Sequence, residues 1–143
     1  MRILIINGPN INMLGLREPD IYGSRSYNDL LEFISAAAGE LGAEVKHFQS
    51  NSEGAIVDAI QASYGKFDGI VINPAAYTHT SIAIPDALKA VAIPAIEVHI
   101  SDIHSREPYR RVSFTSDACL KTVAGEGFES YRTAMRILMD ARV

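Results

Sequence analysis

The sequence predicts an α/β fold in which helices cover both faces of a parallel sheet. Short apolar runs bounded by turn residues, such as Ile3–Asn7 and Gly69–Asn73, alternate with segments of helical periodicity. This alternation is typical of βαβ units, which place helices on both faces of a sheet. The 143 residues fit one domain spanning 1–143, and a hydrophobic content of 48% can form a core without disulfides or metals.

The elements are expected in alternation along the chain. Strands are expected at Ile3–Asn7, Ala43–Gln49, Gly69–Asn73, Pro94–His99 and, as a short fifth strand, Val112–Phe114. Helices are expected at Tyr27–Leu41, Glu53–Gly65, Ser81–Val91, Asp117–Ala124 and Gly127–Ala141. Ser26 is the candidate N-cap of the first helix and Gly42 its stop. At this length we expect a flavodoxin-like three-layer sandwich with strand order 2-1-3-4-5, a fold that does not by itself indicate a function.

Composition and charge argue against several classes of protein. The net charge is −4, and the one basic cluster, Arg106 to Arg111, is too short for a nucleic-acid-binding face. Cys119 is the only cysteine, which excludes an intrachain disulfide, and its flanks favour a buried thiol in a helix. The first apolar run is too short for a signal peptide or a membrane span, so we expect a cytoplasmic protein with no membrane partner.

Polar residues collect where the expected strands end. The first four strands run into Asn7–Asn10, Gln49–Ser52, Asn73–Pro74 and Glu97–Ser101. Any one of these groups could simply form a turn. Open α/β sheets bind their ligands at the carboxyl ends of the strands, so the four groups together predict a site there.

Glu97 and His99 are the sharpest chemical signal in the chain. Residues two apart on a strand point to the same face, which puts the carboxylate beside the imidazole. A carboxylate in that position fixes the histidine tautomer and supports an imidazolium, as a general acid or base requires. A surface pair remains the plain alternative. The amides of Ile100 and Ser101 follow directly and could hold a substrate carboxylate.

A metal site is the other reading of these histidines. His79, His99, His104 and Glu97 could be proposed as ligands, but neither HExxH nor another compact ligand spacing occurs. The sequence therefore predicts no metal.

The segment from about Gly8 to Ser24 is a long connection without helical or strand periodicity. Long loops in compact domains often act as lids over a site. This one carries Arg17 and Tyr22, and an arginine near a tyrosine favours the phenolate, which is a base. An aromatic side chain that only anchors the loop is the alternative.

Four segments complete the sequence pattern: GPNINMLGLREPDIYG, FQSNSEG, GIVINPAAYTHTS and IEVHISDIHSREPYR. Together they resemble the signature segments of the type II 3-dehydroquinate dehydratases, in that family's order and spacing. The match runs from Arg2 to about Leu138. The resemblance implies a hydro-lyase that converts 3-dehydroquinate to 3-dehydroshikimate through an enolate, without a cofactor. It leaves both aromatic amino acid biosynthesis and quinate breakdown open as pathways.

The resemblance also implies how the acid and base are arranged. Tyr22 would remove the proton beside the ketone, while Arg17 lowers the pKa of Tyr22 and helps to close the lid. Asn10 would hold a water molecule that stabilises the enolate. His99 would protonate the departing hydroxyl, and Glu97 would orient His99.

Further residues are implied to bind the substrate or a second subunit. The substrate-binding residues would be Asn73, His79, Ile100, Ser101 and Arg110. Asp86 matches a residue that reaches into the site of a neighbouring subunit, and the family forms dodecamers built from trimers. The chain departs from the family at Pro85, in the early part of the expected third helix, and at Glu126 and Ser130 near the last helix.

Two further readings compete with the dehydratase. A flavodoxin-like binding or signalling module would need a phosphate-binding loop after the first strand, but GPNINMLG has neither the GxGxxG nor the GxxxxGK[ST] pattern. An inactive homologue kept as a structural assembly would not need Arg17, Tyr22, Glu97 and His99, all of which are intact.

Overall fold

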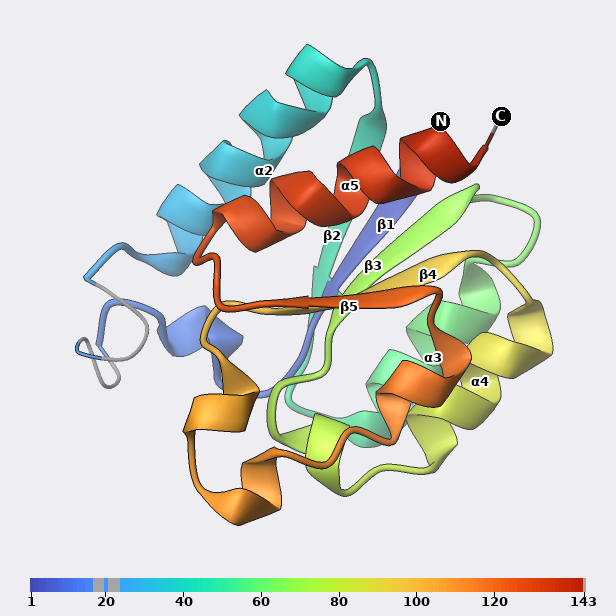
Figure 1. Cartoon of the computed structure of the whole chain (residues 1–143). Coiled ribbons are helices and arrows are strands. Elements are labelled where there is room, and N and C mark those ends of the chain that lie inside the picture. The colour runs from blue at the N-terminus through green and yellow to red at the C-terminus, as the bar shows by residue number, and fades with distance from the viewer. Residues whose placement is uncertain (17–19, 21–23, 143) are drawn as a thin grey trace.

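A five-stranded parallel sheet forms the centre of the computed structural model, which describes residues 1–16, 20 and 24–142 (Figure 1). The strands are β1 (Arg2–Asn7), β2 (Glu44–Gln49), β3 (Gly69–Asn73), β4 (Ala95–His99) and β5 (Lys121–Ala124). Their order is β2-β1-β3-β4-β5, which confirms the predicted order. Because neighbouring strands are parallel, their carboxyl ends share one edge of the sheet.

Helices cover both faces of this sheet, as predicted. In Figure 1, α2 (Tyr27–Leu41) and α5 (Glu129–Ala141) lie on one face, and α3 (Glu53–Ala62) and α4 (Ala83–Val91) lie on the other. Each face of the sheet packs against its helices in a separate hydrophobic core, and alternate residues of β1 belong to different cores. Ile3 and Ile5 pack on the α2/α5 side, and Leu4 and Ile6 on the α3/α4 side. The flavodoxin-like three-layer sandwich is therefore confirmed.

Both predicted caps of α2 are present. The Ser26 hydroxyl accepts a hydrogen bond from the Asp29 amide at 3.1 Å, and the Asp29 carboxylate accepts one from the Ser26 amide at 2.8 Å. This reciprocal pair is a capping box. Gly42 ends the helix with φ of 77°, a left-handed conformation that glycine adopts without strain.

Pro85 fits α4 without breaking it. The helix begins at Ala83, two residues later than predicted, so Pro85 lies in its first turn. Amides of a first turn have no intrahelical acceptor, and a proline there costs no helical hydrogen bond. The helix ends at Val91, and its C-cap, Ala92, has a positive φ of 55°.

The prediction for the segment between β4 and α5 was wrong. Val112–Phe114 is not the fifth strand: the Val112 carbonyl contacts the His79 ring and the Phe114 amide donates to the Thr78 carbonyl. Nor is Asp117–Ala124 a helix, because the 3₁₀ turn η5 (Thr115–Ala118) ends at its second residue and β5 forms its last four. The β-branched residues of β5 mark it as a strand, but the apolar residues before it resemble a helix face.

Cys119 is correspondingly placed outside any helix. It lies half-buried in an extended segment just before β5 and packs against the α3/α4 core. Burial raises the pKa of its thiol to about 12. Within the described part of the chain, no helix has the length and apolar character that crossing a membrane requires.

Candidate active site

A pocket opens at the carboxyl edge of the sheet, where the sequence predicted a site. Its lining includes these residues expected from the sequence: Asn10, Asn73, His79, His99, Ile100, Ser101 and Arg110. They come from the loop after β1, the end of β3, the 3₁₀ turn η2 (Ala75–His79), the end of β4 and the turn η4 (Pro108–Arg110). The sheet thus brings together residues that are up to 100 positions apart, since Asn10 and Arg110 both line the pocket.

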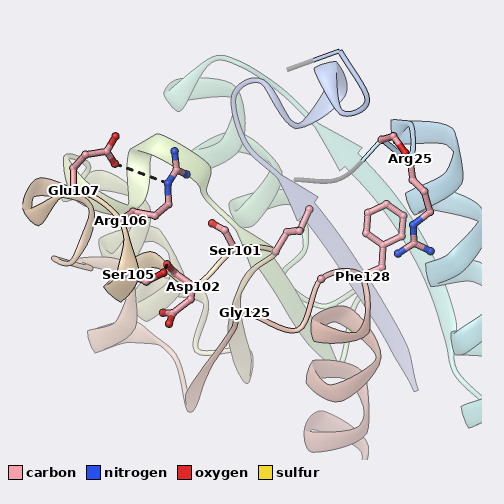
Figure 2. A pocket seen from close by; sticks show the side chains of 11 residues that line it. Arg25, Ser101, Asp102, Ser105, Arg106, Glu107, Gly125 and Phe128 are labelled. Atoms are coloured by element: carbon pink, nitrogen blue, oxygen red, sulfur yellow. Dashed lines mark hydrogen bonds and ion pairs between the residues drawn. The ribbon is translucent and has the colours of Figure 1, made fainter. Parts of the chain in front are cut away.

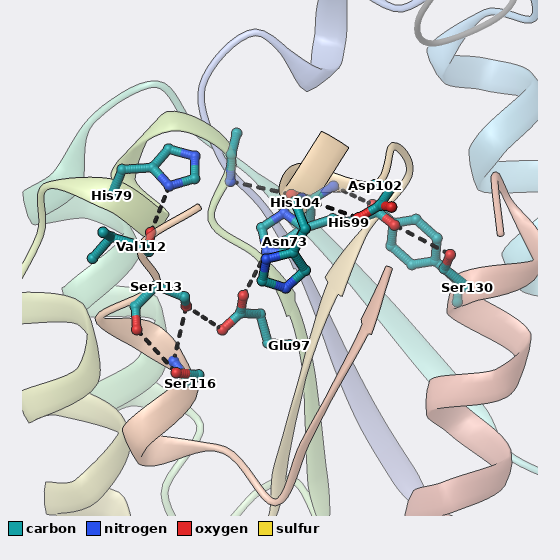
Figure 3. A network of polar contacts seen from close by, with 12 residues as sticks. Asn73, His79, Glu97, His99, Asp102, His104, Val112, Ser113, Ser116 and Ser130 are labelled. Carbon is teal, nitrogen blue, oxygen red and sulfur yellow. Dashed lines mark hydrogen bonds and ion pairs between the residues drawn. The ribbon is translucent and has the colours of Figure 1, made fainter. Parts of the chain in front are cut away.

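The predicted Glu97–His99 pair is present in the wall of this pocket. His99 Nε2 lies 2.5 Å from Glu97 Oε2, and both residues are buried, Glu97 with no exposed surface. Figure 3 shows the second oxygen of Glu97 turned toward Ser113, whose hydroxyl donates to Oε1 at 2.7 Å. A carboxylate only accepts hydrogen bonds, so Nε2 carries a proton and Nδ1 is the nitrogen left for a ligand.

His79 is also held in a defined orientation. Its Nδ1 lies 2.7 Å from the Val112 carbonyl oxygen, which can only accept, so Nδ1 carries the proton and Nε2 remains available. Burial lowers the pKa of His79, and this outweighs the hydrogen bond to Val112, which raises it. The neutral ring can therefore accept a hydrogen bond from a ligand hydroxyl through Nε2.

Asn73 belongs to a buried network on the opposite face of the sheet. Its side-chain amide donates to the Tyr131 hydroxyl at 3.1 Å, and that hydroxyl donates to Asn7 Oδ1 at 2.6 Å. The Asn73 oxygen accepts from the Ala75 amide at 3.1 Å. Burial raises the pKa of Tyr131, which keeps its hydroxyl protonated as a donor. These contacts fix which end of the Asn73 amide faces the pocket.

The loops after β1 and β3 approach each other closely beside the pocket. The Gly8 amide donates to the Asn73 carbonyl at 2.8 Å, and a Cβ on Gly8 would lie 2.6 Å from the Pro74 carbonyl oxygen. Two non-glycine residues at this edge have positive φ, Asn10 at 69° and Ala75 at 53°. The FQSNSEG segment supports the same loops, because the Asn10 amide donates to Asn51 Oδ1 at 3.0 Å.

Residues just before α5 and in its first turn hold the backbone that follows the Glu97–His99 pair. The His99 carbonyl accepts from the Gly125 amide at 3.3 Å and from the Ser130 hydroxyl at 3.2 Å, and the Ile100 carbonyl accepts from the Gly127 amide at 3.1 Å. Ser130 is fully buried. Ser130 is one of the positions at which the chain departs from the family. Because its hydroxyl contacts the His99 carbonyl, this departure affects the backbone of the site as well as packing.

A second hollow adjoins the pocket and shares Ile100, Ser101 and Arg106 with it. Figure 2 shows Arg25 lying against the Phe128 ring in the wall of this hollow. The guanidinium carbon of Arg25 is 3.8 Å from the ring centroid. Ser24 and Arg25, at the end of the expected lid, border this hollow. It therefore extends from the pocket to Ser24 and Arg25.

The structure does not place all of the predicted residues at the pocket. Arg17 and Tyr22 lie outside the described residues, as do positions 18, 19, 21 and 23 of the expected lid, which spans about 8–24. Asp86 is exposed on α4 and does not line the pocket. His104 is also exposed, and no group of three or more metal-binding side chains occurs among residues 1–16, 20 and 24–142.

Sequence reasoning missed two residues of the site, Ser113 and Arg106. Arg106 lines the pocket and belongs to the basic cluster that was set aside as too short for a nucleic-acid face. Its position after the β4 end was the signal that could have identified it. Ser113 was placed in a strand that does not exist, and its contact with Glu97 depends on how the segment folds back.

Comparisons with known proteins agree with the resemblance seen in the sequence. Residues 1–139 match the family model for "Dehydroquinase class II". A 3-dehydroquinate dehydratase from Clostridium acetobutylicum is 57% identical over 92% of this chain and 91% of its own length. Catabolic 3-dehydroquinase 1 from Aspergillus terreus is 56% identical over 93% of this chain and 88% of its own. The crystal structure of a type II dehydroquinase from Butyrivibrio crossotus superposes with a TM-score of 0.95 at 48% identity, covering 97% of both chains.

Proposed function

The chain belongs to the class II dehydroquinases, hydro-lyases that eliminate water from 3-dehydroquinate to give 3-dehydroshikimate, and we propose that His99 is the general acid of this reaction. The observation that carries this role is the buried His99–Glu97 pair in the pocket wall. Loss of a hydroxyl group is accelerated when a positioned acid protonates it. Glu97 stabilises the imidazolium that donates this proton from Nδ1.

The proposed base is Tyr22, with Arg17 as the residue that favours its phenolate. Both lie outside the described residues, and the resemblance of the segment GPNINMLGLREPDIYG supports their roles. A tyrosine with its usual pKa near 10 is a poor base at neutral pH, and a guanidinium beside it stabilises the ionised form. Asn10, which lines the pocket, would hold the water molecule that stabilises the enolate oxygen.

The remaining pocket residues would bind the substrate. The Ile100 and Ser101 amides and the oriented Asn73 side chain suit a carboxylate with its neighbouring hydroxyl, as at other backbone anion sites. His79 offers an acceptor, and Arg110 donors, for the ring hydroxyls. No lysine occurs among the described lining residues, so the geometry favours an enolate over an imine.

We also propose that the chain works as a homo-oligomer, a dodecamer of trimers. Asp86 is exposed and lies outside its own pocket, so a role for it at a site requires a neighbouring subunit. Sedimentation of the purified protein tests this: a monomer at assay concentration would contradict it. We further expect a cytoplasmic location. The reaction belongs to the shikimate pathway, and similarity to a relative named Catabolic 3-dehydroquinase 1 leaves quinate breakdown as a second role.

The deciding experiment follows the conjugated enone of the product after 3-dehydroquinate is added to purified protein. Absorbance should rise, and neither EDTA nor borohydride should slow it, because the proposed steps use no metal or imine. His99→Ala and Tyr22→Phe should each lower kcat by about 10²–10⁴-fold with the fold intact, the range for loss of one acid or base. Exposed Tyr64→Phe serves as the matched control. Full turnover in both site variants would sink the proposal.

A further inference from the structure

Ser113 carries a contact that nothing in the sequence pattern assigned. Its hydroxyl donates to Glu97 Oε1 at 2.7 Å, while the other oxygen of Glu97 pairs with His99 at 2.5 Å. The three groups therefore form a continuous chain from the pocket wall into the loop between η4 and η5 (Figure 3). Glu97 has no exposed surface, so this chain supplies hydrogen bonds that water cannot.

The orientation of the Ser113 hydroxyl is determined by its other contacts. The Ser116 amide donates to Ser113 Oγ at 3.1 Å, and the Ser116 hydroxyl donates to the Ser113 carbonyl at 2.9 Å. An amide N–H can only donate, so it occupies a lone pair of Ser113 Oγ. The one hydroxyl proton of Ser113 is then directed at Glu97.

We infer that Ser113 is a positioning residue that keeps Glu97 ionised, so that the proton of the pair resides on His99. A buried pair that shares one proton has two forms, carboxylate with imidazolium and carboxylic acid with neutral imidazole. Burial favours the neutral form, because it carries no charge. A hydroxyl donated to Glu97 favours the charged form, which is the one that can act as an acid. This inference rests on the proposed role of His99.

Other charged or titratable side chains lie near the Glu97–His99 pair, and the test must leave them unsubstituted. His79 from η2 and Arg110 from η4 lie on the pocket wall with His99, as does Arg106. Cys119 lies close enough to Glu97 for that carboxylate to help raise the pKa of its thiol. The Ser113 hydroxyl donates to Glu97 Oε1 at 2.7 Å, so substitution of Ser113 alone removes one defined contact and leaves these groups unchanged.

The test compares Ser113→Ala, Ser113→Cys and Ser116→Ala with the unchanged protein. Cysteine keeps nearly the volume of serine with a much weaker donor, so it remains informative if the alanine variant folds poorly. Ser116→Ala removes a nearby hydroxyl but keeps the backbone amide and the Glu97 contact. Ring ¹⁵N shifts of His99 report its protonation directly, and steady-state kinetics separate kcat from KM.

We expect Ser113→Ala to lower kcat about tenfold with KM within about twofold, the size expected for losing one donor to a buried charge. Its His99 ring should stay neutral where the unchanged protein shows an imidazolium. The kcat and the His99 ring shifts of Ser113→Cys should lie between those of Ser113→Ala and the unchanged protein. Ser116→Ala should match the unchanged protein in both. Unchanged ring shifts in Ser113→Ala and Ser113→Cys overturn the inference even if kcat falls, since that pattern means a purely structural role. The ring shifts decide this point even if 3-dehydroquinate is not turned over, which would instead refute the proposed function.

Discussion

The two faces of the sheet contribute different polar groups to one pocket. On the α2/α5 face, Asn7, Asn73 and Tyr131 form a network of neutral groups. On the α3/α4 face, Glu97 and His99 form an ionisable pair. Neutral groups can be buried at small cost when they are hydrogen-bonded, whereas buried charges are costly but can move a proton. The fold thus places the neutral network that orients Asn73 on one face of the sheet and the ionisable pair on the other.

The ionisable face should show the largest effect on catalysis. Glu97→Gln keeps the size of the side chain but removes the charge that supports the imidazolium, so kcat should fall by about 10²-fold. The melting temperature should also fall, because the new amide has one acceptor oxygen for the two buried donors of Ser113 and His99. Exposed Glu126→Gln is the control, and steady-state assays at saturating substrate are the measurement. A Glu97→Gln variant with normal kcat would show that the charge is not used.

The neutral face depends on the close approach of two loops, and Gly8→Ala should disturb it. The added Cβ would lie 2.6 Å from a backbone oxygen that cannot easily move. We expect a loss of about 2–3 kcal/mol in the free energy of unfolding, measured by urea titration, as for other overpacked sites. Gly39→Ala is the matched control, because nothing lies within 4 Å of its Cβ, and this variant should be slightly stabilised. Equal effects of the two substitutions would contradict the assignment.

Tyr131→Phe tests the neutral network itself. Removing the hydroxyl leaves Asn7 Oδ1 and the Asn73 amide without their buried partner, which should cost about 1–2 kcal/mol of stability. Asn73 then loses its orientation, so KM should rise more than kcat falls. Thermal unfolding and steady-state kinetics check both, with exposed Tyr64→Phe as the reference. A kcat effect larger than the KM effect would mean that the two faces are not separate.

The smallest effect expected is the pH dependence contributed by His79. Burial lowers the pKa of His79 in the folded state below its ordinary value of 6.5. The folded state therefore prefers the neutral ring, and the stability this gives is complete above pH 6.5 and is lost as the pH falls through the lower folded value. Melting temperatures of the unchanged protein and of His79→Gln should converge as the pH falls from 8 to 5 if the unchanged protein is the more stable at pH 8. Parallel curves would show that His79 does not titrate as described.

Local sequence patterns predicted the parts of the molecule that depend on neighbours in the chain. The capping box of Ser26 and Asp29 involves residues three apart, and Glu97 and His99 are two apart on one strand. Strand ends marked the pocket edge because every strand of the sheet runs in the same direction. For such features, the backbone periodicity alone fixes which side chains meet.

Features that depend on distant segments could not be predicted in this way. Tyr131 meets Asn73 and Asn7 across 58 and 124 residues, and Ser113 meets Glu97 across 16. The error at Val112–Phe114 has the same origin. That short apolar segment pairs with η2 and not with a strand, and its own residues contain no sign of this partner.

The positive φ of Ala75 has a consequence for attempts to make this enzyme more robust. A left-handed alanine costs about 1 kcal/mol that glycine would not, and the chain accepts this cost at Ala92 as well as beside the pocket. Ala92→Gly at the end of α4 should relieve it harmlessly. Ala75→Gly should relieve this strain too. Glycine would also make the backbone more flexible at the amide that donates to Asn73 and orients it. Given the proposed role of Asn73, we expect Ala75→Gly to change thermal stability and substrate affinity together and Ala92→Gly to change stability alone, so laboratory evolution for heat tolerance should accept the second change far more readily than the first.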